Sequence, residues 1–293
     1  MRASFFNIRP ADTLNVSFLL FLIAITFFFH DSIRISTMLV IVFTVLIATQ
    51  IALSKYGRTN TILEYTYDLV FPFFCILIIF ESLGYMVHTV QPRDIDHILV
   101  KIDYMIFHGH PTVLLERFIN PLLTDIMQLA YISYYFLPII LGISLKVKKN
   151  DQLFDRSLFL IIFCFYLSYI GYLLMPALGP RYTINHLHAL DLDGWIIFEP
   201  IQEALNWLEG NKRDAFPSGH TGVALTVLYC AYLYEKKIFW IYLPIVILLI
   251  LSTVYCRYHY VVDVLAGILL AFITIVIGNG YYEFREKRVN SNR

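Results

Sequence analysis

The chain has 293 residues, of which 58% are hydrophobic and 15% charged, and its formal net charge is zero. Soluble domains carry about 25% charged residues, so this composition excludes an ordinary soluble globular protein and indicates one that resides in a lipid bilayer. The balanced charge and the lack of a long basic run argue against nucleic acid as a partner.

The four cysteines, Cys75, Cys164, Cys230 and Cys256, are far apart and lie in or beside apolar runs. They form no Cys-x-x-Cys pair, so we expect buried packing residues and neither a disulfide framework nor a metal site. The first apolar run follows a polar, weakly basic lead without a small-residue cleavage site, which predicts a retained span and not a signal peptide.

Eight apolar stretches are close to the roughly 20 residues that a helix needs to cross a bilayer. Lipid offers no hydrogen-bond partner to backbone groups, so these spans are predicted to be α-helices. They cover residues 14–30, 35–54, 68–88, 119–144, 153–175, 219–235, 238–258 and 261–284. The predicted fold is therefore an all-α, polytopic membrane helix bundle.

Residues 94–107 differ from the spans because apolar and charged residues alternate at helical spacing. One face of this helix is expected to carry Ile95, Ile98, Leu99, Ile102, Met105 and Ile106, while Asp94, His97, Lys101 and Asp103 lie mostly elsewhere. Such a segment is too short and too charged to span, and predicts an amphipathic helix on the membrane surface. A break at 109–111 and a short helix to about Phe118 follow.

The distribution of Lys and Arg predicts the orientation. With eight spans both termini lie on one side, and that side holds fourteen of the 22 basic residues. The positive-inside rule makes it cytoplasmic. The long 176–218 loop and the junction near residue 259 then face outward, to the periplasm, the cell exterior or an organelle lumen.

The stretch Ala215-Phe-Pro-Ser-Gly-His-Thr-Gly222 begins the sixth span on this outer side. Pro217 suits an early helical position, and Ser218 and Gly219 leave backbone amides open at the positive end of a helix. Such a turn binds anions. His220 stands inside it, where a proton donor is useful.

His259 and Asp263, between the seventh and eighth spans, are four residues apart and therefore neighbours on a helix. Asp263 can accept the N–H of one ring nitrogen, which leaves the other nitrogen unprotonated as a nucleophile or base. A carboxylate at this depth requires a partner, and His259 is the nearest one.

Pro-Ser-Gly-His-Thr followed by His-Tyr-Val-Val-Asp resembles the type 2 phosphatidic acid phosphatase superfamily, which includes membrane lipid phosphatases and soluble vanadium haloperoxidases. The resemblance covers about residues 68–284. It implies a metal-independent reaction without a cofactor, in which His259 attacks phosphorus and forms a phosphohistidine. Asp263 would orient His259, and His220 would protonate the leaving oxygen. Ser218 and the Gly219 amide would hold phosphoryl oxygens.

The basic residues depart from the family pattern. Its first motif is usually Lys, six residues, then Arg-Pro; here Gly-Pro-Arg181-Tyr stands at that place, so Arg181 is the candidate phosphate contact. The third motif usually begins Ser-Arg, whereas position 253 is Thr and the nearest arginine is Arg257. A missing arginine there resembles the inositol phosphorylceramide synthase branch. Lys212 and Arg257 are further candidates for substrate binding.

Simpler interpretations remain for several residues. His220 and His259 are alternatively interfacial structural histidines, and Lys212 and Arg257 plain interface cations. His186 and His188 are more typical of loop histidines than of a metal site. Glu81 lies within a span, either as a buried paired group or lining the substrate site.

These observations predict three segments: an N-terminal helix pair (1–67), a six-helix catalytic core (68–284) and a cytoplasmic tail (285–293). The expected function is hydrolysis of a lipid phosphate or diphosphate on the extracytoplasmic face. One alternative is a lipid phosphotransferase that passes the phosphoryl head group to an alcohol. The other is a non-catalytic lipid-binding membrane protein.

Overall fold

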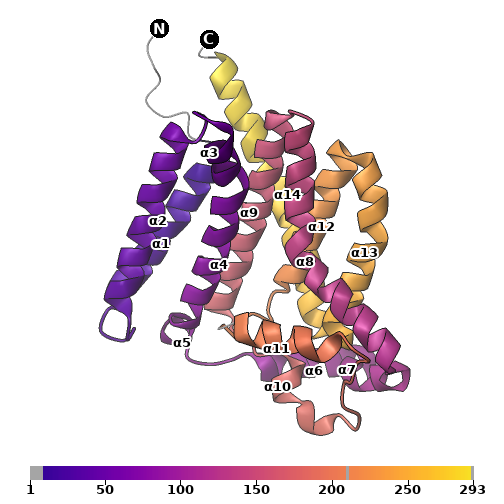
Figure 1. Cartoon of the computed structure of the whole chain (residues 1–293). Helices are drawn as coiled ribbons and strands as arrows, with labels where there is room; N and C mark the ends of the chain where they lie inside the picture. The colour runs from indigo at the N-terminus through magenta and orange to yellow at the C-terminus, as the bar shows by residue number, and fades with distance from the viewer. Residues whose placement is uncertain (1–8, 209–210, 292–293) are drawn as a thin grey trace.

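The computed structural model describes residues 9–208 and 211–291, and within these ranges every regular element is a helix (Figure 1). The long helices are α1 (Pro10–Phe28), α2 (Ser36–Tyr56), α4 (Phe71–Gly84), α8 (Pro121–Val147), α9 (Asp151–Leu174), α12 (Gly219–Tyr234), α13 (Lys236–Tyr255) and α14 (Val261–Ser291). A short helix α3 (Thr61–Tyr65) and a π-helical turn η1 (Thr66–Val70) run directly into α4. The predicted all-α polytopic bundle is confirmed.

Seven helices are long and apolar enough to cross a membrane: α1, α2, the run Thr61–Gly84, α8, α9, α13 and α14. The sixth predicted span forms α12, which has 16 residues and is shorter than a bilayer-spanning helix. It packs against α8, α9, α13 and α14. Helix α1 begins and α14 ends at the same end of the bundle (Figure 1), so α12 completes an even number of passes.

Helix α9 forms the centre of the bundle and packs against α1, α4, α8, α12 and α14. Its apolar side chains point in all directions, which is typical of a helix buried on every side. Cys164 and Leu160 are fully buried in it. All four cysteines are buried, as expected.

The two helices α1 and α2 pack against each other, and α1 also packs against α9. A buried polar cluster fixes this contact. The guanidinium of Arg9, the residue before α1, lies 2.5 Å from Asp68 Oδ1, 3.2 Å from Asp12 Oδ1 and 3.3 Å from Asp155 Oδ1. Lys146 of α8 binds the other oxygen of Asp68 at 2.8 Å. The expected segment boundary at 67/68 falls inside η1, and the division into segments stays a prediction. So does the tail; α14 continues to Ser291, and residues 292–293 lie outside the described ranges.

The opposite end of the bundle carries the short helices and the long loop (Figure 1). They are α5 (Val87–Val90), α6 (Asp96–Phe107), α7 (Pro111–Leu114), η2 (Leu115–Phe118), α10 (Pro180–Thr183), η3 (Asn185–Leu187) and α11 (Phe198–Leu208). Together they form a layer over the ends of α8, α9, α12 and α14.

Helix α6 is amphipathic, as predicted, but its two faces are used differently from expectation. Asp96, Leu99 and Asp103 point into the protein and are buried, whereas Ile98 and Met105 are 47% and 57% exposed. The exposed apolar side is the one that would contact lipid. Asp103 is therefore not a solvated residue of the polar face; it is buried because it caps α14, as described below.

We predict that Arg9→Met strongly destabilises the protein. The substitution leaves Asp68 and Asp12 buried without their cation, and breaking a buried ion pair from one side costs about 3–5 kcal/mol. Arg58→Met is the matched control, because Arg58 is 45% exposed and its ion-pair distances to Glu64 and Asp151 are 3.7 and 3.9 Å. It should cost less than about 1 kcal/mol. Thermal unfolding in detergent micelles compares the two; equal losses would contradict this role of Arg9.

Candidate active site

The predicted anion-binding turn lies at the start of α12 and is held on both sides. Ser218 is the N-cap residue, and its hydroxyl accepts the N–H of Thr221 at 3.3 Å. Its own N–H donates to the Asp263 carbonyl of α14 at 3.1 Å. A Cβ at Gly171 of α9 would collide with the ring of Pro217, so this glycine lets the turn approach the core.

The two predicted catalytic histidines are in direct contact. His259 Nε2 lies 3.3 Å from His220 Nδ1, although 39 residues separate them in the chain. Both side chains are buried, with exposures of 2% for His259 and 6% for His220. The start of α12 and the loop between α13 and α14 thus bring together the two groups that the sequence singled out.

The other nitrogen of His259 is bound differently from expectation. Nδ1 lies 2.8 Å from the carbonyl oxygen of Ala215, an acceptor only, so Nδ1 carries the proton. Asp263 Oδ2 is 3.5 Å from Nδ1 and accepts the N–H of Tyr260 at 2.8 Å. The backbone therefore fixes the tautomer, and Asp263 adds a nearby negative charge. Nε2 of His259 is left with a lone pair, as a nucleophile requires.

Burial lowers the pKa of His259 to about 4, although the carboxyl of Asp214 acts in the opposite direction. The imidazole is thus neutral at physiological pH. Burial raises the pKa of Asp214 above its usual range, while the neighbouring His259 and Arg181 lower it. These electrostatic influences place Asp214, Arg181 and His259 in one site.

Tyrosine rings enclose His220. Its ring centre lies 4.4 Å from that of Tyr131 and 4.3 Å from that of Tyr134, both on α8. Tyr131 in turn stacks on Tyr258 at 4.2 Å. The hydroxyl of Tyr172 on α9 lies against Gly219, the residue whose amide was predicted to bind phosphate. This packing limits the orientations available to the His220 ring.

The three predicted basic residues are placed differently. The Arg181 guanidinium lies 4.8 Å from the centre of the Tyr258 ring and close to both histidines. Lys212 is exposed and approaches the ring of Tyr182 at 5.7 Å. Arg257 points away from the histidine pair: its Nη2 lies 3.0 Å from Glu116 Oε1 and 2.5 Å from the Leu190 carbonyl.

Buried carboxylates attach the layer of short elements to the site. Asp96 of α6 accepts the amides of residues 178–179, just before Arg181, and the hydroxyl of Tyr260 at 2.9 Å. Asp103, one helical repeat further along α6, accepts the amides of residues 261–262 at 2.9 Å each. Helix α6 thereby fixes both the loop that carries Arg181 and the start of α14 behind His259.

The long loop is anchored in the same way. Asp125 of α8 accepts four amides, those of residues 195–198, at the start of α11. Glu116 accepts the amides of residues 189–190 at 3.0 to 3.3 Å. The 176–218 loop is thus an ordered cover over the site end.

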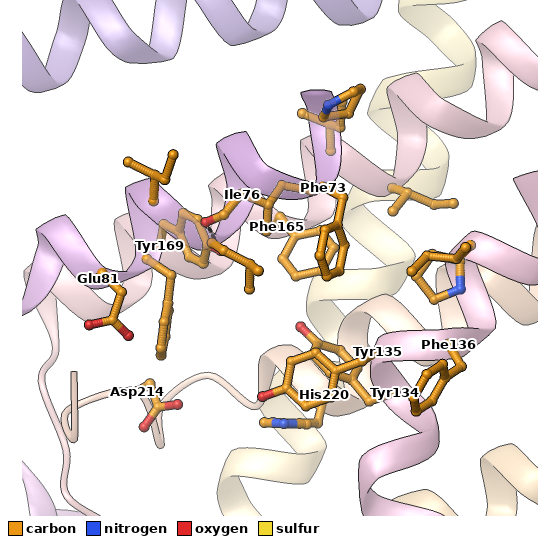
Figure 2. Close-up of a pocket in the computed structure, with 18 of the residues that line it drawn as sticks. Phe73, Ile76, Glu81, Tyr134, Tyr135, Phe136, Phe165, Tyr169, Asp214 and His220 are labelled. Carbon is orange, nitrogen blue, oxygen red and sulfur yellow. Dashed lines mark hydrogen bonds between the residues drawn. The ribbon is translucent and has the colours of Figure 1, made fainter. Parts of the chain in front are cut away.

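A cavity of about 1030 Å³ leads to His220 from within the bundle (Figure 2). Its walls come mainly from α4, α8 and α9 and are apolar over most of their length, with Phe73 and Phe165 as examples. At the site end the lining becomes polar, where Glu81 of α4 and Asp214 of the loop lie near His220 (Figure 2). Glu81 therefore lines the cavity, one of the two interpretations of this residue.

Sequence reasoning did not single out Asp214, Tyr131, Tyr134 or the Ala215 carbonyl. Asp214 and Ala215 directly precede the Phe-Pro-Ser-Gly-His turn, so adjacency was an available signal for them. The tyrosines gave no signal, because they lie nearly 90 residues before His220 among many other aromatic residues. Among the described residues, no three His, Cys, Asp or Glu side chains gather as metal ligands would.

Comparison with known proteins gave one family and two relatives. Residues 97–277 match the family model described as the PAP2 superfamily. A PA-phosphatase related-family protein of Dictyostelium discoideum is 28% identical over 199 residues, which cover 60% of this chain and 36% of that one. A phosphoinositol dihydroceramide synthase of Bacteroides thetaiotaomicron is 26% identical over 156 residues, covering 49% and 51%. The chain thus spans about half or less of these relatives. No solved structure matches.

We predict that protonation of His259 opposes folding in acid. The pKa is about 4 in the folded site and about 6.5 in an unfolded chain. Between these values the unfolded state binds the extra proton, so stability falls as pH falls. From pH 6.5 to 5 this amounts to a loss on the order of 2 kcal/mol.

The measurement is the apparent melting temperature in detergent of the wild type and of His259→Gln over this pH range. The wild type should lose more stability than the variant, whereas His186→Gln, in an exposed loop position, should follow the wild type. Parallel curves for wild type and His259→Gln would contradict the prediction.

Proposed function

We infer the activity from one premise: the chain belongs to the PAP2 superfamily, a family of lipid phosphatases and phosphotransferases, and it is a multi-pass integral membrane protein. We propose that it transfers the phosphoryl group of a lipid phosphate or diphosphate through a phosphohistidine. The contact between His259 Nε2 and His220 Nδ1 at the end of an apolar cavity carries this proposal.

The cavity supports a lipid as substrate. Ligand pockets commonly have volumes of about 300–1,000 Å³ and are mostly apolar, with few polar groups that fix orientation. Here the apolar walls would receive the lipid tails, and the polar end would receive the phosphate. The phosphate group would then take the place of the direct contact between the two rings.

In the proposed reaction His259 Nε2 attacks phosphorus and His220 donates a proton to the leaving oxygen. The Ala215 carbonyl and Asp263 stabilise the proton on His259 Nδ1 as the ring becomes positively charged. Arg181, Ser218 and the Gly219 amide would bind the phosphoryl oxygens. Water or an alcohol then attacks the phosphohistidine, with His220 accepting its proton.

Hydrolysis and transfer to an alcohol share the first half of this reaction. A phosphatase completes it with water, and a transferase with a lipid or sugar hydroxyl. The similarity to a protein named phosphoinositol dihydroceramide synthase favours the second possibility as strongly as the other relative's name favours the first. The product that forms when an acceptor alcohol is supplied distinguishes them.

We predict that His259→Ala lowers release of phosphate from a lipid phosphate by at least about 10³-fold, as loss of a nucleophile does in other enzymes. Chelators should leave the wild-type rate unchanged. The assay uses purified protein with phosphatidic acid, phosphatidylglycerol phosphate, isoprenyl diphosphate and ceramide-based lipids, following phosphate and lipid products, with His186→Ala as the control. Full activity of His259→Ala, or strict dependence on an added divalent metal, would refute the mechanism.

We further propose that the site end faces outward and both termini face the cytoplasm, because basic residues such as Arg58 and Lys148 gather at the terminal end. In intact cells, Asp193→Cys in the 183–194 loop should react with an impermeant thiol reagent. Thr59→Cys, in the exposed turn after α2, should react only after lysis. The reverse pattern would invert the orientation.

A further inference from the structure

Two carboxylic acids at the polar end of the cavity have no role in the reaction described above. Glu81 comes from α4 and Asp214 from the loop before α12, and both line the cavity beside His220 (Figure 2). They are near enough that each influences the charge state of Tyr169, between them on α9, and that Glu81 influences Asp214. Two separate segments thus place acids at the same point.

These acids are unfavourable neighbours for an anionic phosphate. Like charges at short range repel strongly in a site of low dielectric, and ionisable groups at membrane depth are costly and generally functional. A site built only to bind phosphate and water would be better without them. Their position therefore indicates a second ligand group, with hydrogen atoms to donate.

A second observation points to the same ligand. His220 is 94% buried, because its exposure is 6%, it lines the cavity, and its Nε2 has no hydrogen-bond partner among the described residues. Since His220 Nδ1 faces the lone pair of His259 Nε2, Nδ1 carries the proton and Nε2 is an acceptor. A proton-accepting nitrogen and two acids thus converge on one end of the cavity.

We propose that Glu81 and Asp214 form a subsite for the acceptor alcohol, a neutral polyol whose hydroxyl groups bind these acids and whose reacting hydroxyl faces His220. A hydroxyl both donates and accepts hydrogen bonds, so it fits a carboxylate and a carboxylic acid equally well. The raised pKa of Asp214, caused by burial, is consistent with a group that alternates between the two forms.

The step that this subsite serves rests on the proposed phosphohistidine. The alcohol oxygen attacks phosphorus, and a P–O bond forms while the P–N bond to His259 breaks. The electron pair of that bond returns to His259 Nε2, and the hydroxyl proton passes to His220 Nε2. Binding by Glu81 and Asp214 favours the polyol over water in this step.

The test compares two acceptor alcohols, glycerol and 1-propanol, which differ in the two additional hydroxyl groups. Purified protein is given the best lipid phosphate donor from the panel, and the phosphorylated alcohols and free phosphate are measured. The wild type should phosphorylate glycerol at least about 10-fold faster than 1-propanol, since a hydrogen bond to a charged group contributes about 1.5–3 kcal/mol and 1.4 kcal/mol is tenfold. Asp214→Asn and Glu81→Gln should each lower this preference several-fold.

Asp193→Asn, an exposed loop acid outside the cavity, is the control and should keep the wild-type preference. A ratio of two products from one intermediate is insensitive to partial misfolding, because unfolded protein makes neither. If the wild type forms phosphate but never a phosphorylated alcohol, or if both variants keep its preference, the subsite is refuted and the phosphohistidine remains. If the wild type forms no phosphate product from any donor, the proposed function itself fails.

Discussion

Hydrogen bonds from loop amides to buried carboxylates hold the site end of this protein together. An apolar bundle buries its helices by hydrophobic contact, but its loops have backbone groups that need partners near a membrane. Here acidic side chains on α6, α8 and the segment before α8 accept those amides in sets of two to four. The acceptors are Asp96, Asp103, Glu116 and Asp125. Without them the loop with Arg181 and the start of α14 would have no fixed position relative to His220.

The histidine pair depends on this frame because its two members come from different segments. Few contacts within either segment could set a distance of 3.3 Å between two rings. The tyrosines of α8 restrict His220, and the Ala215 carbonyl restricts His259. Pre-arranged groups of this kind need little reorganisation when charge develops. The cavity then decides which molecules reach them, and its apolar walls favour lipids.

Much of the fold could be predicted because apolar length and helix-capping residues are local signals. The spans, the Ser218 cap and the surface helix 94–107 follow from them, and the topology places His220 and His259 at one end. Contacts between distant segments left no such signal: the inward direction of Asp103, the tyrosines around His220 and the pairing of Arg257 with Glu116 depend on tertiary packing. The site roles of His220, His259, Asp263, Arg181, Ser218, Gly219, Lys212 and Arg257 stay predictions.

Helix α6 connects the chemistry to the surrounding lipid. Its exposed apolar side chains float at the boundary between head groups and tails, while Asp96 and Asp103 on its inner side hold the backbone beside Arg181 and behind His259. The height of this helix in the bilayer therefore sets the height of the nucleophile. A membrane whose thickness or surface packing displaces α6 would also displace the catalytic groups, so the bilayer acts as a gauge that matches the site to the depth of its lipid head groups.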